Sequence, residues 1–209
     1  MIQRIFIFLF CCSAISTYAQ LPANAISYSL TVDLKKFDGE AAQELDDTEL
    51  LYETDLYYTA DKVRTVTRVV KRPDDYELTF RQRLYDQNST DEYNIEYPNR
   101  TMVMKEKHVY KPKSTGKTKK ILNYTCKEYQ VVDFRGNTIT FWVTDKLGKN
   151  VCPWGNFSLK GTALEIIASN GLHFKATDFA AGELEADFFN VPQGFETQKI
   201  PFPEVKKTK

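Results

Sequence analysis

Apolar and polar residues alternate along much of this chain, and the alternation predicts β-strands. In Ile26–Leu34 every second residue is apolar, and the residues between are Ser, Thr or Asp. A period of two places all the apolar side chains on one face of an extended strand. Other segments rich in β-branched and aromatic residues are separated by turn residues and predict further strands. They are Leu51–Tyr58, Lys62–Lys71, Tyr76–Tyr85, Thr101–Tyr110, Ile121–Asp133, Thr138–Thr144, Ala163–Ala168, Leu172–Thr177 and a last one near Phe188.

Four stretches interrupt the strand pattern. Asp38–Leu50 is acidic with a weak apolar stripe and predicts a short helix or a solvated loop. Lys111–Lys120 combines lysines with a proline and a glycine and predicts an exposed loop. Phe134–Asn137 predicts a hairpin turn, since its glycine and asparagine can adopt positive φ. Cys152–Asn156 contains a proline and a glycine and predicts an irregular passage.

These elements predict a mainly β protein with minor α content. Strands spaced at about ten residues, with few helical stretches, are typical of a curved antiparallel sheet or an incomplete β-barrel. The length of the chain suits one domain with a sizeable core. We expect a single domain over residues 20–203 and a disordered tail over residues 204–209.

The first nineteen residues have the features of a cleavable secretory signal. Arg4 supplies a positive charge, an apolar run begins at Ile5, and the small residues Thr17 and Ala19 precede Gln20. The prediction is a signal peptide over residues 1–19, cleaved after Ala19. The mature protein is then periplasmic or secreted.

Two kinds of membrane attachment are alternatives to cleavage. The apolar run Ile5–Ile15 is shorter than the roughly 20 residues that span a bilayer, which disfavours a retained helix. Lipid attachment at Cys11 or Cys12 is disfavoured because bulky Phe10 stands where a lipoprotein signal has a small residue. The mature chain is therefore not expected to be an integral membrane protein.

Cleavage would leave two cysteines, Cys126 and Cys152, in an oxidising compartment. A disulfide between them is the leading prediction, and two free buried thiols are the alternative. In the chain-entropy model such a bridge would stabilise the fold by about 3.5 kcal/mol.

Charge and motifs exclude several functions. The chain has 28 Lys and Arg against 28 Asp and Glu, so no nucleic-acid partner is indicated. The two histidines, His108 and His173, have no metal-binding or triad-like spacing, and no nucleophile elbow or phosphate-binding glycine loop occurs. No catalytic residues, metal site or cofactor are expected, and the protein is not predicted to be an enzyme.

Several motifs resemble a family of exported Bacteroidetes proteins of unknown function related to the GLPGLI type. The run KKILNYTCKEY at Lys119–Tyr129 and the aromatic strand ITFWVTDKL after it carry the resemblance. LKGTALEI at Leu159–Ile166 and VPQGFE at Val191–Glu196 look like the later segments of the family, although the first departs from the GLPGLI naming motif. Such families are similar in fold to the LolA and LolB lipoprotein carriers. The resemblance implies an incomplete antiparallel barrel with an apolar concavity under a short helical lid.

The expected function is binding in that concavity. With 14 Phe, 12 Tyr and 2 Trp, the chain has enough aromatic residues to line a surface that shields a lipid, a lipoprotein or an apolar peptide. The alternative is an envelope sensor or protein-interaction module that binds another envelope protein through a sheet edge or the lysine-rich stretch Lys105–Lys120. The candidate ligand-binding residues are Tyr28, Phe80, Met102, Met104, Phe141 and Trp142.

Overall fold

The computed structural model describes residues 20–37, 49–72, 82–88, 92–96, 101–105 and 110–200, without the side chains of residues 96, 101–105 and 196–200. Strands dominate these ranges. They are β1 (Gln20–Asp33), β2 (Glu49–Tyr58), β3 (Lys62–Lys71), β4 (Gln82–Asp86), β5 (Glu92–Glu96), β6 (Thr101–Lys105), β7 (Lys113–Ile121), β8 (Tyr124–Val132), β9 (Thr138–Thr144), β10 (Thr162–Ala168), β11 (Leu172–Glu185) and β12 (Glu196–Ile200). The described helical segments are α1 (Leu34–Phe37) and the 3₁₀ turn η1 (Ala186–Phe189).

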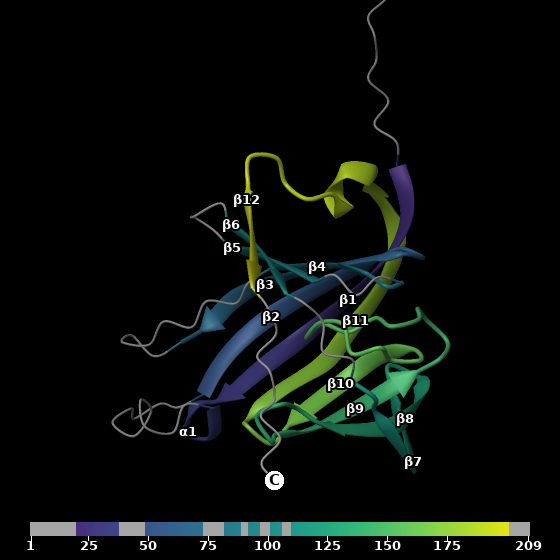
Figure 1. Cartoon of the computed structure of the whole chain (residues 1–209). Helices are drawn as coiled ribbons and strands as arrows, with labels where there is room; N and C mark the ends of the chain where they lie inside the picture. Colours follow the sequence, from purple (N-terminus) through teal and green to yellow (C-terminus); the bar gives the residue numbers. More distant parts are fainter. Residues whose placement is uncertain are drawn as a thin grey trace, which may run out of the picture.

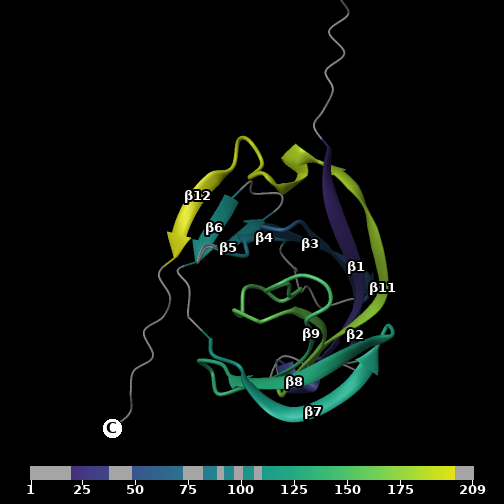
Figure 2. The same cartoon turned by 90° about the vertical axis from the view of Figure 1, so that its right-hand side faces the viewer.

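All twelve strands form one sheet in the order β12-β6-β5-β4-β3-β2-β1-β11-β10-β9-β8-β7. Neighbouring strands are antiparallel, except that β12 runs parallel to β6. The sheet curves strongly and is not closed, so that β12 and β7 are its two ends (Figures 1 and 2). The predicted class, a mainly β protein built on a curved antiparallel sheet, is confirmed. Among the described residues, no helix has the length and apolarity needed to cross a bilayer.

The predicted alternation in the first strand places it at the centre of the sheet. β1 pairs with β2 on one side and with β11 on the other. Its apolar residues from Ile26 to Val32 are buried, while the polar residues that alternate with them are only partly buried. The strand begins at Gln20, six residues earlier than the alternation indicates.

The inner face of the curved sheet is covered by the long connection between β9 and β10, residues 145–161, which we call the inner loop. Figure 2 shows it folded into the middle of the curve. Its Phe157 ring lies 4.9 Å from the ring centroid of Phe141, and Trp154 lies 6.4 Å from that of Phe174. The resemblance implied a helical lid over this face. The segment found there is the non-helical inner loop, and the described helical segments α1 and η1 have only four residues each.

The lysine-rich stretch is a strand, which corrects the prediction of a loop at Lys111–Lys120. β7 forms a hairpin with β8 through Leu122 and Asn123, whose φ values of 47° and 66° are both positive. Two central residues with positive φ are the geometry of a tight hairpin turn. The turn is hard to predict from the sequence because Leu122 occupies its first central position, where the usual signal is Asn-Gly or Asp-Gly. The turn predicted at Phe134–Asn137 is present, with Gly136 at φ +87°.

Other elements also differ from the predictions. β5 was not predicted, and the segment near Phe188 is the turn η1 instead of a strand. Glu49 and Leu50 belong to β2, whereas the rest of Asp38–Leu50 lies outside the described residues. The η1 turn packs on the outer face of the sheet, where the Phe188 ring meets Tyr57 edge-on at 5.0 Å.

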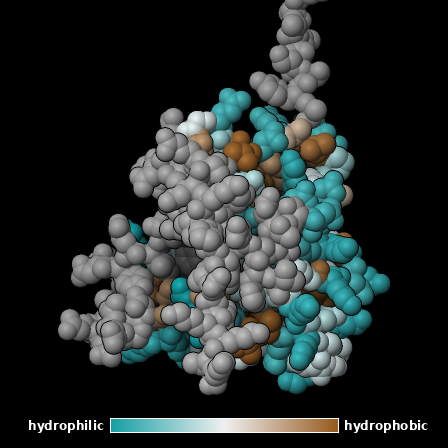
Figure 3. Space-filling model, in the orientation of Figure 1, coloured by the Kyte–Doolittle hydropathy of each residue, from teal (hydrophilic) through white to brown (hydrophobic). Residues whose placement is uncertain are grey.

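The described part of the surface has no broad apolar area in the view of Figure 3. It is mostly hydrophilic, with scattered hydrophobic residues. Single exposed apolar side chains are ordinary on proteins and need no functional explanation.

Candidate binding pocket

A pocket of about 700 Å³ lies where five parts of the chain meet. They are the first residues of β1, the later part of β11, the turn between β2 and β3, Gln87 just after β4, and the beginning of the inner loop. Ligand pockets commonly measure about 300 to 1,000 Å³ and are mostly apolar with a few polar groups. The lining residues are Leu21, Pro22, Ala23, Asn24, Tyr58, Thr59, Ala60, Asp61, Gln87, Leu147, Gly148, Lys149, Ala181 and Gly182.

Hydrogen bonds tie the β2–β3 turn to the end of β4. The Thr59 hydroxyl accepts the backbone N–H groups of Asp61 and Lys62, at 3.3 and 3.1 Å. The Gln87 side-chain amide donates to the Thr59 carbonyl at 2.9 Å, and the Gln87 backbone N–H donates to the Asp61 carbonyl at 2.6 Å. Because backbone groups are fixed on both sides, this wall of the pocket is pre-formed.

Two pocket residues show where the pocket is closed and where it is open. A Cβ on Gly148 would lie 2.7 Å from the Tyr58 ring and 2.6 Å from Val151, so the inner loop lies close against this wall. Ala181 on β11 pairs with Asn24, which in turn pairs with Tyr58, so these three residues share one face of the sheet. Ala181 is exposed, and its side chain therefore lies on the open side of the pocket.

Asn150 fixes the start of the inner loop beside the pocket. Its side-chain amide donates to the carbonyl of Gln87 at 3.2 Å and to the Asn156 side chain at 2.8 Å. Its side-chain oxygen accepts the Leu159 backbone N–H at 3.1 Å. One buried side chain thus joins β4 to both ends of the loop.

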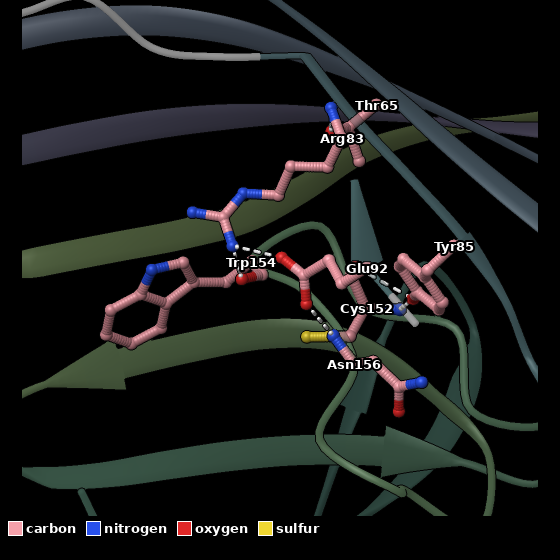
Figure 4. Close-up of polar contacts among 7 residues, drawn as sticks. All are labelled: Thr65, Arg83, Tyr85, Glu92, Cys152, Trp154 and Asn156. Carbon is pink, nitrogen blue, oxygen red and sulfur yellow. Dashed lines mark hydrogen bonds and ion pairs between the residues drawn. The ribbon is translucent and has the colours of Figure 1, made fainter. Parts of the chain in front are cut away.

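Tyr85 holds the middle of the loop from the inner face of β4. Its hydroxyl accepts the Cys152 backbone N–H at 2.9 Å (Figure 4). It also lies 3.1 and 3.2 Å from the carbonyls of Cys152 and Asn150. Burial raises the pKa of Tyr85 well above its ordinary value. The hydroxyl therefore stays protonated and serves the loop both as donor and as acceptor.

An ion pair holds the next part of the loop. Arg83 Nη1 lies 3.1 Å from Glu92 Oε1 and also donates to the Trp154 carbonyl, while Glu92 Oε2 accepts the Asn156 backbone N–H at 3.1 Å (Figure 4). Gly155 passes so near that a Cβ there would lie 2.8 to 2.9 Å from both charged groups. Only a glycine fits this backbone without moving the pair.

The sequence-predicted ligand residues do not come together in a site. Tyr28 and Phe141 are fully buried in the core, and the Tyr28 hydroxyl donates to the Ala163 carbonyl at 2.7 Å. Trp142 follows Phe141 on β9 and so points to the opposite face of the sheet. There the Lys119 Nζ lies 4.3 Å from the centroid of its ring. Of the other three candidates, Phe80 lies outside the described residues, as do the side chains of Met102 and Met104 on β6.

None of the candidates placed by the structure lines the pocket, and little in the sequence indicated the residues that do. The pocket is lined by residues at strand ends and in turns, many of them small, whereas the prediction rested on large aromatic residues within strands. The single useful signal was the irregular passage at Cys152–Asn156, which lies in the inner loop.

Beside Trp142, the outer face carries a cluster around Glu165. This carboxylate accepts hydrogen bonds from Lys119 and, at 2.9 Å, from His173. Burial alone would raise the pKa of Glu165, but these two hydrogen bonds and the nearby charges hold it below its ordinary value. The cluster is a satisfied ion-pair network. Within the ranges described above, no group of three or more His, Cys, Asp or Glu residues is placed to hold a metal ion.

The structure shows no disulfide between Cys126 and Cys152. Cys126 and Cys152 are both free and fully buried. They lie on different kinds of structure, Cys126 on the regular strand β8 and Cys152 on the inner loop, whose position is set by the contacts of Tyr85. This matches the alternative of two free buried thiols.

The two thiols are expected to react slowly in the folded protein and quickly after unfolding. Burial raises the pKa of Cys126 to about 11 and that of Cys152 to about 12, so little thiolate exists near neutral pH. Iodoacetamide labelling followed by intact mass is the measurement. In the chain without residues 1–19, two adducts should form in denaturant without reductant, and a protein that takes up label only after reduction would contain a bridge.

No protein-family model matches the sequence, and no curated protein is similar to it. Among solved structures, PNGF-II in two crystal forms is similar with TM-scores of 0.55 and 0.56, at 17% identity over 87% of this chain. The chain spans 31% and 32% of PNGF-II in these two structures. An uncharacterized conserved protein from Thermus thermophilus has a TM-score of 0.44 at 11% identity, covering 86% of this chain and 90% of that one. At this identity, the likeness to PNGF-II is a likeness of fold alone.

Proposed function

We propose that this protein is a non-catalytic binding module of the bacterial periplasm, and that it shields the apolar chain of a lipid or lipoprotein in the pocket beside Gly182. The observation that carries the proposal is the pocket itself, about 700 Å³ in volume and lined mainly by apolar and small residues. The export signal indicated by the sequence supports the location. Shielding on the broad inner face is not part of the proposal, because the inner loop fills that face.

The energetics suit reversible binding. Burying about ten methylene groups yields roughly 8 kcal/mol at about 0.8 kcal/mol each. Association costs an estimated 4 to 15 kcal/mol, so the net affinity is moderate. A ligand held in this way can be passed on to another acceptor, as carriage requires.

Filling the pocket tests the proposal. The Ala181→Leu variant is expected to lower the affinity for a fluorescent fatty acid at least tenfold, since the larger side chain would occupy the open side of the pocket. Displacement of the probe by palmitate, with native mass spectrometry of the complex, measures the effect. The fold tolerates the change because Ala181 is an exposed strand residue.

Ala180→Leu is the matched control. It makes the same change at the preceding position of β11, where successive residues point to opposite faces, and Ala180 does not line the pocket. This variant should bind the probe like the original protein. Equal affinity in Ala181→Leu, or no fatty-acid binding by the original protein, would contradict the proposal.

A further inference from the structure

Arg83 and Asn94 lie directly opposite each other on neighbouring strands, β4 and β5. Opposed residues of an antiparallel pair have Cβ atoms about 4.5 to 5.5 Å apart and share one face of the sheet. That face is the inner one, since Arg83 reaches the inner loop there. The two side chains therefore belong to one polar patch inside the curve.

Arg83 has hydrogen-bonding capacity to spare. Nη1 makes the contacts with Glu92 and the Trp154 carbonyl, and the Nε and Nη2 groups have no partner among the described residues. Figure 4 shows the other terminal nitrogen pointing away from both partners. A quarter of the side chain remains exposed, at 25%, so solvent and solutes reach it.

Asn94 is a buried donor with nothing to bind among the described residues. The residue is 2% exposed, and its side-chain nitrogen makes no hydrogen bond with them. Leaving such a group unpaired costs about 1 to 3 kcal/mol, and buried polar groups are nearly always paired. The unpaired Asn94 amide lies opposite Arg83, whose Nε and Nη2 groups also lack a partner among the described residues. The two side chains together therefore indicate that a hydrogen-bond acceptor from a ligand belongs here.

We infer that Arg83 and Asn94 form a subsite for a carboxylate group of a ligand. Every unmatched group here is a donor, and an ionised carboxylate only accepts hydrogen bonds. The free Nε–Nη2 edge of a guanidinium is also the fork that binds a carboxylate with two parallel hydrogen bonds. Both Glu92 oxygens are already engaged, one by Arg83 and one by the Asn156 backbone, so this acid does not supply the missing acceptor.

The subsite is separate from the pocket beside Gly182. Neither Arg83 nor Asn94 lines that pocket. Gln87, which does, lies four residues further along the chain, and the Tyr85 contacts with the inner loop lie between the two places. Because Glu92 neutralises part of the Arg83 charge and the Asn94 amide must be uncovered, a simple carboxylate is expected to bind only in the millimolar range.

Acetate titration of the full-length, isotope-labelled protein tests the inference. The Arg83 Nε–H signal in the NMR spectrum, assigned by its absence in Arg83→Lys, is expected to shift downfield and saturate with sodium acetate. Sodium chloride at equal ionic strength should not produce a saturating shift. No shift, or the same shift with chloride, would overturn the subsite, and this readout does not depend on the stability of any variant.

Asn94→Leu provides the second arm. Removing a buried, unpaired amide is expected to leave the fold intact, while the dissociation constant for acetate should rise about tenfold, because a hydrogen bond to a charged group is lost. Lys175→Met, which removes an exposed lysine on the outer face, is the control and should bind acetate normally. An unchanged constant in Asn94→Leu would remove Asn94 from the site. Ala181→Leu should also bind acetate normally, so failure of the fatty-acid test and failure of this one are distinguishable.

Discussion

Replacing Tyr85 with phenylalanine is expected to lower the free energy of unfolding by about 3 kcal/mol. The hydroxyl accepts the Cys152 backbone N–H and lies within hydrogen-bonding distance of the Asn150 and Cys152 carbonyls, all in the buried interior. Each buried polar group left unpaired costs about 1 to 3 kcal/mol. The substitution changes no ring packing, so the effect isolates the hydroxyl. Urea unfolding followed by tryptophan fluorescence measures it, with Trp154 of the inner loop among the reporters.

Tyr58→Phe is the matched control. Tyr58 is also buried, at 3% exposure, but its hydroxyl makes no hydrogen bond with a described residue. Burial raises the pKa of Tyr58 to about 12, so this hydroxyl is also neutral at physiological pH. The control should cost less than about 1 kcal/mol, since no hydrogen bond is lost. If the two variants unfold at the same urea concentration, Tyr85 does not anchor the inner loop.

Gly155→Ala is expected to destabilise the protein by about 3 kcal/mol or more. Gly155 has φ +124°, a conformation that residues with a Cβ rarely adopt. The added methyl group would also approach Glu92 and Arg83 to 2.8 and 2.9 Å, so the ion pair and the Trp154 carbonyl contact must shift. Thermal unfolding by circular dichroism measures the loss.

Gly136→Ala separates the two causes. Gly136 also has positive φ, at +87°, but a Cβ there would meet nothing within 4 Å. Only the backbone cost of roughly 1 to 2 kcal/mol applies to this turn. If Gly155→Ala lowers the stability no more than Gly136→Ala does, the inner loop can move away from the ion pair at little cost in free energy.

The sequence predicted the fold class because alternation is a local property. In β1 and β2 most buried residues are followed by a more exposed one, and that pattern can be read without knowing any partner strand. The edge strand β7 was missed because its first six residues are all exposed and carry no such alternation. Strand identity there depends on pairing with β8, which is a property of the neighbour.

The candidate site was less predictable than the fold. Aromatic residues were expected to line a ligand surface, but Tyr28 and Phe141 are core residues once the inner loop covers them. Arg83, Glu92 and Asn94 come from two short strands, of which β5 carries no clear strand signal in the sequence. These residues lie close together because of the register in which β4 and β5 pair. That register cannot be read from a single sequence.

The central position of β1 constrains the order in which this chain can fold. Gln20 pairs with Glu185, so the strand that follows the N-terminal segment has no partner on one side until nearly the whole chain is available. Contacts between such distant residues form slowly, because a long loop must close before they stabilise anything. The hairpins β2–β3 and β7–β8–β9 can form early from local contacts. The two halves of the sheet join only when β11 pairs with β1. If the chain crosses a membrane with its N-terminus first, the sheet cannot be completed until the last strands have crossed. Until then the partly folded chain would be accessible to chaperones.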